Sequence, residues 1–307
     1  MFQAIQLTNS IVETSDASFL VDEIFPNQPL VISFGFVDWE KSPAFDFYGR
    51  VKKLELETSK PINRILIRDK SNMWYHLGIP GLGPHVDEVT ENLREIIQVI
   101  APSRIITVGQ SMGAYAAIMF GALLQVDQIL AFGPLSFLDS QQALLYHDRR
   151  WLSVMMDLEQ NLPPSYYFDL PELLEKTGQA SKVDIFFGTK PDQGANESVN
   201  LDVLHAFRFK PLPNCEIHPV PPSGHAVVKY LIDTNQMDSI LGQFILGVPA
   251  VRLVNYENQE ILSSDWLNWI KENLNLGISS NDLITILMEH GFTEHQGHWA
   301  LYRAQRD

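Results

Sequence analysis

Short apolar runs alternate with helical patterns from residue 30 to about residue 246. The runs are rich in β-branched and aromatic residues and end near glycine or proline, which is typical of buried strands. They comprise residues 30–34, 64–68, 105–108, 128–132, 183–187 and 215–220. Between them, apolar side chains recur at helical spacing, most clearly over residues 86–100 and 112–124. Continuously apolar strands joined by helices favour a mostly parallel sheet with helices on both faces, so we predict an α/β fold.

Two stretches within the first 250 residues depart from this pattern. Residues 2–21 alternate around turn residues, which predicts a small antiparallel meander. Residues 134–182 contain no clear strand, and an excursion of this length favours a lid or cap insertion. A pair of helices packed at the sheet edge is an equally good interpretation of that segment.

The C-terminal part of the chain has a different character. Capping residues at positions 263 or 264, 280 and 293 predict three short helices. We therefore expect an α/β domain over residues 1–250 and a small helical domain over residues 251–307. The helical domain loosely resembles the ubiquitin-associated type of three-helix module, and docking of a protein partner is one role that such a bundle can have.

The charge balance limits the partners of the chain. Its 37 Asp and Glu residues against 22 Lys and Arg residues give a formal net charge of −15, which nucleic acids and anionic membranes would repel. A single cysteine, Cys215, argues against disulfides and a Cys-rich metal site, and the sequence has no His-x-His or His-Glu-x-x-His cluster. The N-terminus lacks the pattern of a secretion signal, and no run of about 18 apolar residues occurs. We expect a soluble, cytoplasmic protein with no cofactor, no metal, and no nucleic-acid or membrane partner.

The sequence Gly109-Gln110-Ser111-Met112-Gly113 matches the G-x-S-x-G pattern of a nucleophile elbow. An apolar strand leads directly into it and a helix rich in small residues leads out, which is the context that the pattern requires. Glycine is needed two positions before and after the serine, because side chains there would collide with the neighbouring strand and helix. Ser111 is therefore the candidate nucleophile, and a tight turn with a capping serine is the alternative.

A serine nucleophile needs a histidine base, and the expected order along the chain is Ser, then Asp or Glu, then His. His225 fits the base because it follows the last strand after a Pro-Pro-Ser-Gly turn, at the edge of the sheet where such folds place their sites. His218 lies inside that strand and is interpreted as structural, and His205 falls in a predicted helix as a surface or core residue. The histidines of the C-terminal helices lie outside the predicted site; they are His290, His295 and His298.

Asp192 is the predicted acid that orients His225. It follows the strand over residues 183–187 after a Gly-Thr-Lys-Pro sequence, again at a C-terminal strand end. Glu197 and Asp202 are further along and remain alternatives, whereas Asp184 lies within the strand and is expected to face away. A turn or helix-capping role is the other interpretation of Asp192.

Two backbone amides are candidates for the oxyanion hole. The N–H of Met112 follows from the elbow itself, and the N–H of Phe36 follows from the bend that Gly35 allows after the strand over residues 30–34. Phe36 and Trp39 would give this wall of the site an aromatic character. Trp39 and Gln110 are the candidate substrate-binding residues.

From residue 30 to residue 246 the chain resembles the α/β-hydrolase superfamily, on the order of its strands, the elbow, the late acid and the late histidine. More narrowly, Ser33-Phe34-Gly35, Ile67-Arg68-Asp69, residues 74–78 and residues 109–117 are similar to bacterial hydrolases found beside polysaccharide or secondary-metabolite genes. That resemblance implies an esterase, deacylase or acyltransferase. Asp69 and His76 could border the pocket, although hydrogen-bonding scaffold is the commoner role of such residues.

These observations predict a serine hydrolase that cleaves a carboxylic ester or thioester through an acyl-enzyme intermediate, with Ser111, His225 and Asp192 as its triad. An acyltransferase with the same triad is one alternative, and a non-catalytic module that binds a partner is another. The apolar residues of the 134–182 segment favour a small-molecule or carrier-bound acyl substrate.

Overall fold

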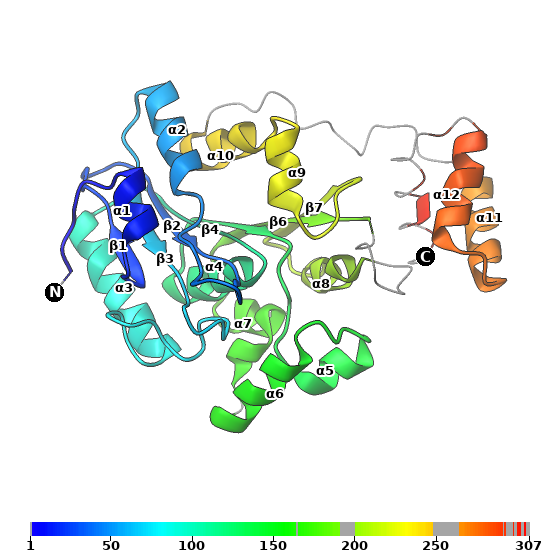
Figure 1. The fold of residues 1–307 in the computed structure, drawn as a ribbon, viewed down its shortest axis with the longest axis horizontal. Coiled ribbons are helices and arrows are strands. Elements are labelled where there is room, and N and C mark those ends of the chain that lie inside the picture. The colour runs from blue at the N-terminus through cyan, green and yellow to red at the C-terminus, as the bar shows by residue number, and fades with distance from the viewer. Residues whose placement is uncertain are drawn as a thin grey trace.

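The computed structural model describes residues 2–163, 165–190, 200–247 and 264–290, together with residues 292, 297, 300, 301 and 304. Its centre is a seven-stranded sheet in the order β1-β3-β2-β4-β5-β6-β7 (Figure 1). Strands β2 to β7 run parallel to one another, and β1 pairs with β3 in the antiparallel sense. The strands are β1 (Phe19–Val21), β2 (Leu30–Phe34), β3 (Asn63–Ile67), β4 (Ile105–Gln110), β5 (Gln128–Phe132), β6 (Lys182–Gly188) and β7 (Cys215–Val220).

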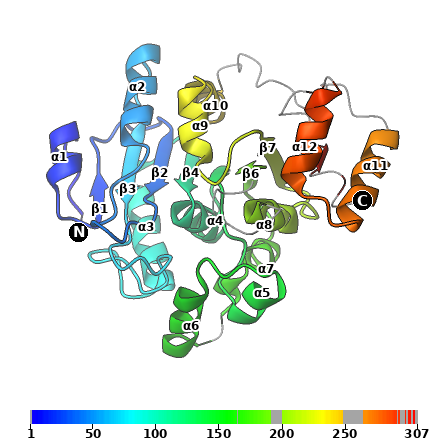
Figure 2. The ribbon, with the colours of Figure 1, turned by 45° about the vertical axis from the view of Figure 1, so that its right-hand side comes forward.

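Helices cover both faces of the sheet, which confirms the predicted α/β architecture (Figure 2). One face packs against α3 (Val86–Ile100), α4 (Met112–Leu124) and α8 (Leu201–Phe209). The other packs against α2 (Tyr48–Thr58), α9 (Val227–Asp233) and α10 (Met237–Leu246). Strands β2, β3 and β5 are buried on both sides along their whole length, so their continuous apolar runs follow from the need to fill two cores at once.

The predicted N-terminal meander was wrong. The described residues there form a short helix, α1 (Asn9–Thr14), followed by the single strand β1. The side chain of Thr8 accepts a hydrogen bond from the amide of Ile11 and caps the helix, while Val12 is buried against the sheet edge. A local cap and one buried helical face therefore outweighed the weak alternation of the sequence.

The segment between β5 and β6 is helical. It contains α5 (Ser140–Leu145), α6 (Leu152–Asn161), the 3₁₀ turn η1 (Tyr166–Phe168) and α7 (Leu170–Lys176). Leu170 and Leu173 of α7 and Met155 of α6 are buried in the same core as α4. The segment is thus anchored to the α/β core, and its role as a lid stays a prediction.

The C-terminal helices α11 (Ser264–Asn275) and α12 (Ser280–Glu289) form where the sequence predicts them. The cap of α12 is Ser279, whose side chain accepts a hydrogen bond from the amide of Asp282, rather than Ser280. Most of the third predicted helix, with His295 and His298, lies outside the described residues. Among the described residues, no helix is both long and apolar enough to cross a bilayer.

Candidate active site

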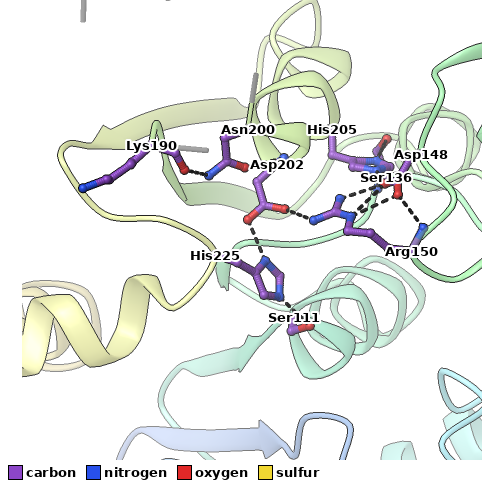
Figure 3. A network of polar contacts seen from close by, with 9 residues as sticks. All are labelled: Ser111, Ser136, Asp148, Arg150, Lys190, Asn200, Asp202, His205 and His225. Atoms are coloured by element: carbon purple, nitrogen blue, oxygen red, sulfur yellow. Dashed lines mark hydrogen bonds and ion pairs between the residues drawn. The ribbon is translucent and has the colours of Figure 1, made fainter. Parts of the chain in front are cut away.

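Ser111 occupies the sharp turn between β4 and α4, as the G-x-S-x-G pattern predicts (Figure 3). Its backbone has φ 51° and ψ −119°, a conformation that costs a non-glycine residue free energy. The amide of Ser111 donates to the carbonyl of Phe132 at 2.8 Å, which ties the turn to β5. Within the described part of the chain, no side-chain hydrogen bond from Ser111 caps α4. The hydroxyl is therefore available to another partner, and the capping interpretation is not supported.

The two glycines of the pattern are needed for the close approach of strand and helix. A Cβ on Gly109 would lie 2.1 Å from the carbonyl oxygen of Gly113, and a Cβ on Gly113 would lie 2.2 Å from that of Phe34. Both contacts are with backbone, which cannot rotate away. The strain at Ser111 is thus maintained by tight packing of β2, β4 and α4.

His225 lies between Ser111 and a carboxylate. It follows β7 and precedes α9, so it stands at the C-terminal edge of the parallel sheet beside the elbow. Its Nε2 is 3.0 Å from Ser111 Oγ, and its Nδ1 is 2.6 Å from Asp202 Oδ2 (Figure 3). Gly133, with φ 59°, packs closely against this contact. A Cβ at Gly133 would lie 3.5 Å from Nδ1 of the ring. The ring can accept the serine proton at one nitrogen while the other donates to the carboxylate.

Among the described residues, the carboxylate beside His225 Nδ1 belongs to Asp202, one of the two alternatives to Asp192, whose role stays a prediction. A neutral ring with its proton on Nδ1 donates that proton to Asp202 Oδ2, which lies 2.6 Å away. Asp202 is the second residue of α8, where Asn200 caps the helix and accepts a hydrogen bond from the amide of Asp202 at 2.8 Å. Asp192 itself, like Glu197, lies outside the described residues.

Asp202 is ionised in this environment although only 1% of its side chain is exposed. Burial acts to raise its pKa, but the hydrogen bond and charge of His225 and those of Arg150 outweigh it, so the pKa lies below its usual range. Arg150 Nη1 is 2.8 Å from Asp202 Oδ1, the oxygen that His225 does not use. Asp202 also lies at the start of α8, where the positive end of the helix dipole favours its ionised form.

Sequence reasoning missed Arg150 and Asp148. Arg150 pairs with Asp148, and Asp148 Oδ2 lies 2.9 Å from Nε2 of the buried His205 (Figure 3). Arg150 and Asp202 are 52 residues apart on different elements, so no local motif joins them. The available signal for this polar network was the three-residue spacing of Asp202 and His205 on one helix. That spacing points to the network only when the position of the helix in the fold is known.

The remaining candidate residues belong to the elbow itself, as Met112 and Gln110 do, or to the chain after β2, as Phe36 and Trp39 do. β2 and β4 are paired in register with Phe34 opposite Gly109, which brings the chain after Gly35 to the same sheet edge as Met112. Phe36 is 38% exposed and Trp39 is 58% exposed. The Gln110 side chain donates to Asp46 Oδ2 at 2.9 Å, so it ties the elbow to the loop before α2.

Asp69 and His76 are both buried. Asp69 accepts hydrogen bonds from the amides of Ser71, Met73 and Tyr75, as expected of scaffold. His76 packs against Phe168 with ring centroids 4.8 Å apart, and burial lowers its pKa to about 3. It is therefore neutral at physiological pH.

Two further titratable side chains, those of His218 and Cys215, have surroundings that are typical of structural residues. His218 Nε2 lies 2.6 Å from Asp184 Oδ1, and Gln128 donates to the other oxygen of Asp184, which confirms the structural interpretation of His218. Together with Glu216 these residues place possible metal ligands within 4.8 Å of one another, but Asp184 is already bonded at both oxygens. Burial raises the pKa of Cys215 to about 12, so its thiol stays protonated at neutral pH.

No family model matches the sequence, and no curated protein matches it. A capsule O-acetyltransferase of Neisseria meningitidis serogroup A is similar in structure, with 16% identity, a TM-score of 0.47, and coverage of 71% of this chain and 89% of that chain. Acetyl xylan esterase 1 from Thermoanaerobacterium sp. has 15% identity, a TM-score of 0.46, and coverage of 75% and 77%. The S-formylglutathione hydrolase FrmB of Staphylococcus aureus has 16% identity, a TM-score of 0.43, and coverage of 76% and 89%.

These similarities are distant, and the fold is assigned from the topology of the chain itself. Six parallel strands with an antiparallel strand at one edge carry a strained serine between β4 and α4. A histidine follows the last strand and faces that serine. This arrangement is the α/β-hydrolase fold, as the sequence predicts.

Proposed function

We propose that this protein is a serine hydrolase that cleaves a carboxylic ester or thioester through an acyl-enzyme intermediate. The observation that carries the proposal is the chain of contacts from Ser111 Oγ to His225 Nε2 at 3.0 Å and from His225 Nδ1 to Asp202 Oδ2 at 2.6 Å. The base is within hydrogen-bond distance of both the nucleophile and the orienting acid, and the nucleophile lies on a strained elbow. The order Ser111, Asp202, His225 along the chain is the one this fold uses.

The reaction follows from the geometry. Ser111 Oγ attacks the substrate carbonyl carbon as its proton passes to His225 Nε2, while Asp202 stabilises the imidazolium that forms. The amides of Met112 and Phe36 are the proposed donors to the oxyanion. His225 then returns the proton to the leaving group, which departs and leaves an acyl group on Ser111. Water, deprotonated by His225, releases the acyl group and restores the serine.

Hydrolysis of p-nitrophenyl acetate tests this proposal. Ser111→Ala and His225→Ala are expected to lower kcat at least about 1,000-fold, because each removes an essential part of the proton transfer. Asp202→Asn is expected to cost at least about 100-fold, whereas Asp192→Asn leaves turnover within about two-fold of wild type.

The possible outcomes separate the serine mechanism, the choice of acid and the type of acyl acceptor. Turnover that survives in Ser111→Ala, or a folded wild type without any turnover of short acyl esters and thioesters, would rule out the mechanism and favour a non-catalytic module. An equal loss in Asp192→Asn and Asp202→Asn would contradict the choice of acid. Faster acyl transfer to an added alcohol or amine than to water would make the protein an acyltransferase with the same triad.

A further inference from the structure

The oxygen of Asp202 that faces away from His225 has a partner from a distant part of the chain. Arg150 lies in the turn between α5 and α6, within the helical segment that joins β5 and β6, and its Nη1 is 2.8 Å from Asp202 Oδ1 (Figure 3). The two oxygens of Asp202 thus serve a histidine on one side and a guanidinium on the other. A carboxylate held at both oxygens cannot rotate about its last bond without losing one contact.

Arg150 is itself fixed by Asp148. Its Nε lies 3.0 Å from Asp148 Oδ1, its Nη2 lies 2.7 Å from Asp148 Oδ2, and its backbone amide also donates to Asp148 Oδ1. This two-pronged pairing sets the plane of the guanidinium and aims Nη1 at Asp202. A lysine at this position would supply the positive charge but not the planar group that pairs with both oxygens of Asp148.

His205 closes the network at the far end. The amide of Ser136 donates to His205 Nδ1 at 2.9 Å, so the ring carries its proton on Nε2 and donates it to Asp148 Oδ2. Burial lowers the pKa of His205, although its contact with Asp148 acts to raise it. A second proton would have to enter at Nδ1, where the Ser136 amide already donates and the Ser136 hydroxyl also lies 2.9 Å away. His205 is therefore neutral and cannot absorb a change in charge elsewhere in the network.

We propose that Arg150, held by Asp148, is a positioning residue that fixes Asp202 and through it the ring of His225. The proposal deepens the proposed function and rests on it. With His205 neutral, the side chains of Asp148, Arg150 and Asp202 carry a net charge of −1, which matches the single positive charge that His225 takes up. Without Arg150, two buried carboxylates would lie together without a cation, so the arginine makes full burial of the acid possible.

Removal of Arg150 or of Asp148 should shift the pH midpoint of His225 protonation in opposite directions. Arg150→Met removes a positive charge near His225, which stabilises the imidazolium, so protonation of the ring should shift to higher pH by about 1 unit. Asp148→Asn removes a negative charge and should shift it to lower pH. Arg150→Lys keeps the charge and should leave the midpoint near that of wild type. These shifts report the charge coupling between the network and His225, and the positioning role of Arg150 is separated from it by the kinetics of Arg150→Lys.

Low-field proton NMR measures this without any need for turnover. The proton between His225 Nδ1 and Asp202 Oδ2 should give a strongly deshielded resonance that is absent in His225→Gln, and its pH titration gives the midpoint. Arg149→Met, the same change at the exposed neighbouring arginine, serves as the control and should titrate like wild type. Titration curves of Arg150→Met and Asp148→Asn that coincide with wild type, or the absence of this resonance in wild type, would overturn the proposal.

Kinetics on p-nitrophenyl acetate supply the second measurement. Arg150→Met should lower kcat by about 10- to 100-fold with little change in KM, because the acid and the base lose their alignment and the substrate contacts remain. Arg150→Lys should recover part of that loss, and Arg149→Met should lose nothing. Wild-type kcat in Arg150→Met would overturn the proposal, as would an Arg150→Lys variant that folds and is no more active than Arg150→Met. Signed NMR shifts in a wild type that turns over no ester would contradict the proposed function and leave the positioning role intact.

Discussion

At the scale of the residue, Asp46 shows how the surroundings of the elbow alter a single side chain. Burial raises the pKa of its carboxyl to about 6, and this outweighs the hydrogen bonds from the Phe47 amide and the Gln110 side chain, which act to lower the pKa. The unfolded chain releases this proton near pH 3.8. Between about pH 4 and pH 6 the folded chain therefore holds a proton that the unfolded chain has lost. Asp46 thus destabilises the fold increasingly as the pH rises through this window.

The pH dependence of unfolding tests this account of Asp46. Asp46→Asn should match the wild-type free energy of unfolding near pH 4 and exceed it by about 2 kcal/mol at pH 8, because the variant has no charge to bury. Urea denaturation of both proteins at several pH values gives the difference. A difference that does not change with pH would mean that the Asp46 carboxyl titrates normally.

Residues differ in how far their roles can be predicted from sequence. Ser111 and His225 are predictable because the chemistry requires them beside local signals, namely paired glycines and a turn after the last strand. The acid is harder to locate, because several carboxylates follow β6 and the sequence does not say which of them the folded chain brings to His225; among the described residues Asp202 lies there. Asp192 follows the strand more closely, yet Asp202 gains the helix N-terminus and the contact with Arg150.

At the scale of the element, one buried ion pair joins the antiparallel edge strand to the parallel sheet. Asp22, just after β1, lies 2.6 Å from Nε of Arg64 on β3, and Glu55 of α2 lies 3.0 Å from Nη2 of the same arginine. Asp22 also accepts a hydrogen bond from the amide of Leu7. Three elements thus meet on one arginine, which is almost completely buried.

Removal of the Asp22 charge should weaken this edge of the sheet. Asp22→Asn is expected to lower the free energy of unfolding by about 3 kcal/mol, because it leaves a buried guanidinium partly unpaired. Glu172→Gln breaks the exposed pair with Lys176, whose atoms are 2.5 Å apart, and should cost less than about 1 kcal/mol. Chemical denaturation compares the two variants. Equal losses would show that burial does not set the strength of these pairs.

Element boundaries were predictable where burial and helical spacing agree. α3 and α4 span the predicted residues, because an apolar stripe and the elbow set their limits. The N-terminal segment was mispredicted, because six helical residues carry too little periodicity to outweigh an apparent alternation. The contact of α8 with the α5–α6 turn has no signature in either segment alone.

At the scale of the whole molecule, the C-terminal helices form a separate apolar cluster. Ile270, Leu283 and Leu287 pack with one another and with Leu301. In the part of the chain that the structure describes, the large clusters on the two faces of the sheet are made of residues from the first 246 positions, as are the residues of the candidate triad. The fold of the α/β part therefore does not require the apolar residues of α11 and α12.

A chain that ends at Gly247 should remain folded and turn over a small ester at a rate within about two-fold of the full chain, since stability comes mainly from each part's own core. Circular dichroism and p-nitrophenyl acetate hydrolysis measure both properties. A loss confined to protein-bound or carrier-bound acyl substrates would indicate that the C-terminal helices dock the partner. Unfolding of the shortened chain would contradict the independence of the two cores.

Labelling with a fluorophosphonate tests the central claim most directly, because the probe reacts with an activated serine and not with an ordinary one. We expect a covalent adduct on Ser111 of the folded wild type, located by mass spectrometry of its peptides. Labelling should be absent in Ser111→Ala, and at least about 100-fold slower in Asp202→Asn, in which the base loses its orienting charge. A folded wild type that carries no adduct on Ser111, or an adduct formed equally fast in Asp202→Asn, would contradict the account.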